Sequence, residues 1–147
     1  MASISLLGSI TTDRENPKDV DLLVVVADDT DLAVLAAHAR RLEGGAQQFD
    51  CGADIFLADE QANYLGRTCH WKDCRPGIRV ACEALNCGRR PHLYDDLDDV
   101  RLSKQTVEAP PVTVWPRVVR RCALPADVER ALALLDTPSN KALEPSA

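Results

Sequence analysis

The stretch SLLGSITTDRENPKDVDLLVVV, residues 5–26, decides the fold of this chain. An apolar run ends in Gly8-Ser9, a polar segment follows, and the triplet Asp-Val-Asp at positions 19–21 opens a second apolar run. This pattern predicts two strands, over residues 3–7 and 20–26, joined by a loop. The second run is almost continuous in Val and Leu, which is typical of a strand buried on both faces.

Asp19 and Asp21 are candidate metal ligands. Alternate residues of a strand point to the same face, so the two carboxylates should stand side by side. Two like charges at such close range repel each other, and a cation between them relieves the repulsion. Mg²⁺ suits this role because it takes oxygen ligands, usually one or two carboxylates together with substrate phosphates. Gly8 would let the backbone come close to a ligand, and N–H groups beside Ser9 would hold phosphate oxygens.

The order of these motifs resembles the signature of the nucleotidyltransferase superfamily: Gly8-Ser9, then a spacer, then an Asp-x-Asp triplet on a strand. Its members carry a third carboxylate on a later strand, and Asp54 within GADIFL, residues 52–57, matches it. The resemblance covers about residues 4–58. It implies an α/β fold of the DNA polymerase beta type, with a small mixed sheet and helices packed on it.

The resemblance also implies a mechanism. Asp19, Asp21 and Asp54 would bind two Mg²⁺ ions, and Gly8 and Ser9 would position the β and γ phosphates of a nucleoside triphosphate. One ion would orient the triphosphate, and the other would activate an acceptor hydroxyl for in-line attack on the α-phosphorus. Asp54 would hold the catalytic ion and help to take the hydroxyl proton. The expected activity is transfer of a nucleoside monophosphate to a hydroxyl acceptor.

The acceptor and the partners stay open at this stage. Members of the superfamily modify proteins, antibiotics, tRNA and other nucleotides, and small stand-alone members often belong to toxin–antitoxin pairs. The acceptor is therefore a protein, an RNA or a small molecule, and a protein partner or a homodimer is also compatible with the sequence. The alternative function is a non-enzymatic module, in which a nucleotidyltransferase-like fold serves as a binding or antitoxin-like partner.

Length and composition narrow the class of protein. The chain has 147 residues, of which 46% are hydrophobic and 27% charged, as expected for one globular domain. Its net charge of −6 argues against a protein that wraps nucleic acid over its whole surface. The first residues lack the basic start of a signal peptide, and no apolar run is long enough for a membrane span. We therefore expect a cytoplasmic protein.

The rest of the chain predicts further elements. Asp28, Asp29 and Asp31 supply turn and N-cap residues before a helix that starts at Leu32 and should end at Gly44-Gly45. The other expected elements are a strand over residues 53–57, a short helix over 59–65, an edge strand over 112–115 and a helix over 126–135. The expected division is a core over residues 1–66, a Cys-rich segment over 67–104, a connection with the last helix over 105–137 and a tail over 138–147.

Two evenly spaced cysteine pairs, Cys69 with Cys74 and Cys82 with Cys87, mark the Cys-rich segment. Four thiolates in a reducing compartment predict a structural Zn²⁺ site. The alternatives are that some of these cysteines are small buried apolar residues, or that two of them form a redox pair. Arginines in the same segment would suit phosphate groups through bidentate contacts; they are Arg75, Arg79, Arg89 and Arg90.

Overall fold

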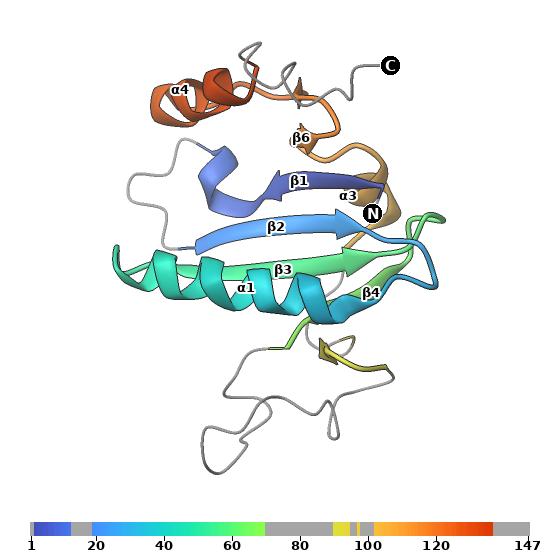
Figure 1. Ribbon diagram of the computed structural model, residues 1–147. Helices are drawn as coiled ribbons and strands as arrows, with labels where there is room; N and C mark the ends of the chain where they lie inside the picture. Colours follow the sequence, from blue (N-terminus) through green and yellow to red (C-terminus); the bar gives the residue numbers. More distant parts are fainter. Residues whose placement is uncertain (1, 13–18, 70–89, 95–96, 98–101, 137–147) are drawn as a thin grey trace, which may run out of the picture.

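The computed structural model describes residues 2–12, 19–69, 90–94, 97 and 102–136. These residues form one seven-stranded sheet with the strand order β5-β4-β3-β2-β1-β6-β7 (Figure 1). The strands are β1 (Ser3–Leu7), β2 (Asp19–Val25), β3 (Gly52–Ala58), β4 (Tyr64–Thr68), β5 (Leu93–Tyr94), β6 (Val112–Trp115) and β7 (Val119–Arg120). The helices are α1 (Leu32–Gln47), α3 (Lys104–Glu108), α4 (Ala126–Leu135) and the 3₁₀ helix η1 (Gly8–Thr11). The expected α/β class with a mixed sheet is confirmed.

Strand β2 lies at the centre of the sheet. It pairs antiparallel with β1 and parallel with β3, and α1 makes the connection between the two parallel strands. The three strands expected in the first 58 residues are therefore present. Between β2 and β3 the register sets Asp19 against Gly52 and Asp21 against Asp54.

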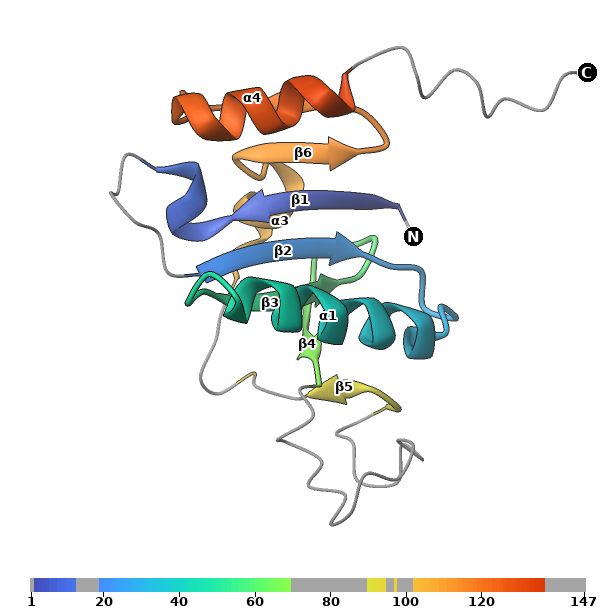
Figure 2. The same ribbon diagram turned by 60° about the vertical axis from the view of Figure 1, so that its left-hand side comes forward.

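The two faces of the sheet have separate apolar cores. On the first face, α1 lies along β2 and β3 (Figures 1 and 2), and its buried Leu32 and Ala39 join Val24, Ile55 and Leu57. The second face buries Leu7, Leu23, Ala58, Ala62 and Val107, the last of which comes from α3. Alternate residues of β2 thus serve different cores, as the period of two in a strand requires.

Helix α1 is longer than expected. Its N-terminus agrees with the prediction, because the Asp31 carboxylate accepts a hydrogen bond from Ala33 N at 2.9 Å. The expected stop at Gly44-Gly45 is wrong, since the helix runs through both glycines to Gln47. Glycine in a helix costs about 1 kcal/mol relative to alanine, which packing elsewhere on the helix can offset. The residue that adopts the left-handed backbone conformation after the helix is Asp50, with φ 56°.

No helix in the described ranges is long and apolar enough to cross a membrane.

The expected helix over residues 59–65 is also wrong. The Asp59 carboxylate accepts hydrogen bonds from Gln61 N at 2.9 Å, from Asn63 N at 2.8 Å and from Asn63 Nδ2 at 3.0 Å. This arrangement closes a turn in which Ala62 has φ 64°. The turn reverses the chain into β4, which pairs antiparallel with β3. Hydrogen bonds from a side chain to the nearby backbone compete with helix formation. The chain therefore turns at Asp59 and continues as strand β4.

The C-terminal part of the described chain extends the sheet beyond β1. The expected edge strand, β6, pairs with β1 on one side and with β7 on the other, so it is an inner strand. Helix α4 starts after Pro125 as predicted and packs Val128 and Leu132 against Val112 of β6. Leu135, at the end of the same helix, is 49% exposed. Arg120 of β7 forms ion pairs with Glu129 at 2.8 Å and Asp136 at 3.3 Å.

Replacing Asp59 by Ala should destabilise the protein by about 1 kcal/mol, because the turn loses its acceptor for three hydrogen bonds in an exposed position. Urea unfolding of the two proteins measures this difference. Asp59→Asn is the matched control: it keeps a carbonyl oxygen that can accept from the backbone and should retain most of the stability. Equal unfolding midpoints for the Ala variant and the wild type would contradict this role.

Candidate functional site

Three carboxylates, those of Asp19, Asp21 and Asp54, occupy the face of the sheet opposite α1; we call them the acidic triad. Leu22 and Val24 of β2 pack toward the α1 core, so Asp19 and Asp21, which alternate with them along the strand, face the other way. Asp21 and Asp54 are direct partners across the parallel pair, and Asp19 lies one pleat earlier on β2. The structure therefore brings the three acids selected from the sequence to one face and to neighbouring positions.

The acidic triad is electrostatically coupled. Asp21 is half-buried, and its pKa is raised from 3.8 to about 6. Burial makes the largest contribution, and the negative charges of Asp54 and then Asp19 add to it. Each of these causes disfavours the ionised form of the carboxyl group. A positive charge placed at this face would lower the pKa of Asp21, and so oppose the effect of the two neighbouring acids.

A glycine lies beside each acid of β2. A Cβ atom on Gly8, which has φ 74°, would lie 2.7 Å from Asp21 Oδ2. A Cβ atom on Gly52 would lie 2.6 Å from Asp19 Oδ1. Gly8 was expected to let a ligand approach the backbone, whereas in the structure the Asp21 carboxylate makes the close approach. The part played by Gly52 was missed, because only the strand register shows that it faces Asp19.

The segment after β1 forms a short turn of 3₁₀ helix. Thr11 Oγ1 donates to Gly8 O at 2.7 Å, and Thr12 N donates to Ser9 O at 3.1 Å. These bonds fix the backbone of Gly8 and Ser9 next to the start of β2. The two residues expected to hold phosphate groups thus adjoin the acidic triad.

The acidic triad has the oxygen donors that a hard cation such as Mg²⁺ prefers. Nevertheless, no set of three or more His, Cys, Asp or Glu side chains among the described residues is grouped closely enough to hold a metal ion. The positions of the carboxylates account for this, since Asp21 leans over Gly8 of η1 while Asp19 leans over Gly52 of β3. A shared ion would require rotation of these side chains.

An arginine and an aromatic ring lie farther along the same face. Phe56 follows Asp54 by two residues, so both point to one side of β3, and Arg67 of β4 is the register partner of Phe56. The Arg67 guanidinium stacks over the ring of Tyr94 on β5, 4.2 Å from its centroid. Tyr94 is 37% exposed, so its ring lies at the protein surface.

Only one of the four cysteines expected to bind zinc lies within the described ranges. Cys69 is buried at the end of β4, and its sulfur accepts a hydrogen bond from Arg40 Nη2 at 3.8 Å. Cys74, Cys82 and Cys87 lie outside the described residues, as do Arg75, Arg79 and Arg89. The zinc site therefore stays a prediction.

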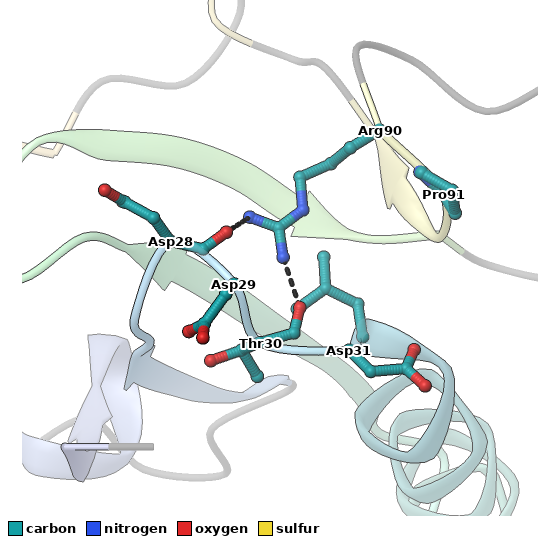
Figure 3. A pocket seen from close by; sticks show the side chains of 7 residues that line it. Asp28, Asp29, Thr30, Asp31, Arg90 and Pro91 are labelled. Carbon is teal, nitrogen blue, oxygen red and sulfur yellow. Dashed lines mark hydrogen bonds between the residues drawn. The ribbon is translucent and has the colours of Figure 1, made fainter.

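A hollow lies beyond the opposite end of β2, in the connection from Val25 to α1. This open depression of about 380 Å³ is lined by residues 28–32, Arg90 and Pro91. Arg90, a candidate for phosphate binding, donates to the backbone oxygens of Asp28 and Thr30 instead (Figure 3). The guanidinium thus ties the segment before β5 to the loop before α1, which is a structural role.

Comparison with known proteins yields no match: no protein-family model, no curated protein and no solved structure corresponds to this chain. The function proposed below therefore depends on the geometry of the acidic triad and on the sequence motif that contains it.

The raised pKa of Asp21 predicts a pH-dependent effect on stability. The folded protein holds the Asp21 proton up to about pH 6, whereas the unfolded chain releases it near 3.8, so stability falls as the pH rises through this window. Asp21→Asn removes the charge. Its melting temperature, in buffer with chelator, should exceed that of the wild type by a few degrees at pH 7 and by much less at pH 4. Asp29→Asn, in an exposed turn, is the control, and a difference independent of pH would argue against the assignment.

Proposed function

We propose that this protein is a Mg²⁺-dependent nucleotidyltransferase that moves a nucleoside monophosphate from a nucleoside triphosphate to a hydroxyl acceptor. The observation that carries the proposal is the register of β2 and β3, which sets Asp21 against Asp54 with Asp19 on the same face. The Gly8-Ser9 turn beside these acids supports it. The resemblance of residues 4–58 to the nucleotidyltransferase superfamily selects this activity among those that use clustered carboxylates.

The acidic triad would hold the metal ions in this reaction. Bound Mg²⁺ supplies Lewis-acid polarisation of the phosphate oxygens and makes the acceptor hydroxyl more acidic. A carboxylate oxygen of Asp54 takes the proton of that hydroxyl. The acceptor oxygen then forms a bond to the α-phosphorus, the bond from this phosphorus to the bridging oxygen breaks, and pyrophosphate leaves.

The remaining groups on this face have complementary roles. Backbone N–H groups at Gly8 and Ser9 bind the β and γ phosphates, as in other loops that turn tightly around a phosphate. A cationic side chain on the same face as the acidic triad favours an anionic substrate, and Arg67 meets this condition. The acceptor, whether protein, RNA or small molecule, binds on the side of the α-phosphorus opposite to the departing pyrophosphate.

Mg²⁺-dependent nucleotide binding is the first consequence to measure. Calorimetric titration with ATP, GTP, CTP and UTP should show binding of at least one nucleotide with Mg²⁺ and much weaker binding without it. Asp19→Ala/Asp21→Ala should abolish the metal-dependent part, whereas Asp29→Ala should preserve it. Absence of binding for all four nucleotides would reject the enzyme in favour of a non-enzymatic partner protein with the same fold.

Each acid of β2 should also be needed for the reaction. With α-labelled nucleotide and cell extract as the source of acceptor, Asp19→Ala or Asp21→Ala should lower the labelling rate by at least ~10²-fold, because the transition state loses fixed negative charge that holds the cations. Asp29→Ala, with the same change of side chain in the turn between β2 and α1, should label at the wild-type rate. Near-normal labelling by either triad variant would refute its assignment.

A further inference from the structure

Three side chains form a row across strands β3, β4 and β5. Phe56 is the register partner of Arg67, and Arg67 is the register partner of Tyr94. Leu57 and Leu93, which alternate with members of this row along their strands, are buried in the core under α1. The row therefore lies on the opposite face of the sheet, which also carries the acidic triad.

The row begins beside the acidic triad. Phe56 is two residues from Asp54 on β3, so Arg67 is the diagonal neighbour of Asp54 across the antiparallel pair. Diagonal neighbours in such a pair are about 7–8 Å apart, within reach of long side chains. Arg67 and the Tyr94 ring beyond it thus adjoin the acid that would take the proton of the acceptor hydroxyl.

The order of the strands places the acidic triad between this row and the Gly8-Ser9 turn. The turn follows β1 on one side of β2, whereas β4 and β5 lie beyond β3 on the other side. A substrate whose β and γ phosphates bind the turn therefore has the row on the far side of its α-phosphorus. In-line displacement brings the acceptor from that side.

The ring of Tyr94 is held in place without being buried. Leu93 anchors β5 in the core with 2% exposure, while Tyr94 is 37% exposed. The backbone of Tyr94 lies close against Gly66 of β4, where a Cβ atom would be 2.5 Å from Tyr94 O. The Arg67 guanidinium then lies 4.2 Å from the ring centroid. The backbone and one cation thus set the position of the ring and leave part of its surface exposed.

Two other rings on this face have a different environment. The rings of Phe56 and Tyr64 have centroids 6.2 Å apart and planes tilted by 50°. Both residues are half-buried, and Phe56 packs against the core that contains Val107. Packing accounts for these two rings but not for the exposed ring at position 94.

We propose that Arg67 and Tyr94 form a nucleobase-binding platform next to the acidic triad. This inference rests on the proposed function, in which the substrate is a nucleotide. A base stacks on an aromatic ring or on the plane of a guanidinium group, and a guanidinium also binds phosphate oxygens. The base belongs either to the nucleoside triphosphate or to a nucleotide acceptor, and binding measurements with each separate the two sources.

AMP in buffer with chelator tests the platform without metal. Proton spectra should show an upfield shift of the Tyr94 ring resonances as AMP is added, because a stacked base shields the ring. Ribose 5-phosphate, which lacks the base, should leave these resonances in place, and the ring of Tyr64 serves as an internal control. Absence of a base-dependent shift at Tyr94 overturns the inference.

Tyr94→Leu should raise the dissociation constant of AMP by at least ~5-fold, the loss expected when one stacking ring is removed. Tyr94→Phe keeps the ring and should bind AMP as the wild type does. Phe49→Leu removes a ring that is 79% exposed and lies past the end of α1, so it should have no effect. Equal affinities of Tyr94→Leu and the wild type for AMP would speak against the platform. The spectra of the wild type decide the question if Tyr94→Leu fails to fold.

Calorimetry identifies the source of the base. Weaker binding of ATP with Mg²⁺ by Tyr94→Leu assigns the platform to the base of the nucleoside triphosphate. Weaker binding of a short single-stranded oligonucleotide assigns it to a nucleotide acceptor. Unchanged binding of both ligands overturns the inference.

The same measurements separate this inference from the proposed function. A base-dependent shift at Tyr94, in a protein whose binding of ATP does not depend on Asp19 and Asp21, means that the platform exists while the proposed function fails. Binding of ATP that requires both acids, without any shift at Tyr94, means that the proposed function stands while the platform does not exist.

Discussion

The parallel pairing of β2 with β3 is the constraint on which the rest of the structure depends. Residues of both strands alternate between the core under α1 and the core on the other face, so their register is fixed by two sets of buried side chains. A slip of one residue would exchange the faces and break the packing of both cores. The same register that buries Leu23 and Val24 sets Asp21 against Asp54.

This arrangement has an electrostatic cost that the fold limits in two ways. The acids lie at the starts of β2 and β3, while the middle and the ends of these strands carry the buried residues. In addition, Gly8 and Gly52 allow two of the carboxylates to lean apart, toward different neighbouring segments. The pKa of Asp21, the half-buried member, is raised first by burial and then by repulsion from Asp54 and Asp19.

The sequence was sufficient where one physical signal dominated. Short apolar runs predicted the three first strands. The Asp-x-Asp spacing predicted the shared face, because it follows from the period of two in a strand. The last helix and the N-cap at Asp31 followed from equally local signals.

The sequence failed where local preferences competed with tertiary contacts. Gly44-Gly45 lie inside α1 because packing of the helix on the sheet outweighs the propensity of two residues. Asp59 closes a turn through its own carboxylate, where the pattern of residue types favoured a helix. Pairings between distant segments, such as Asp19 with Gly52 or β6 with β1, could not be predicted, since no local pattern specifies which strands become neighbours.

The positions of the two outermost strands, β5 and β7, could not be predicted for the same reason. Each is only two residues long, and β7 carries an arginine held by acids of α4 and the residue after it. Outer strands this short give another molecule little backbone on which to add a strand. The described sheet is thereby protected against edge-to-edge aggregation, even though its inner strands are as apolar as those of aggregation-prone segments.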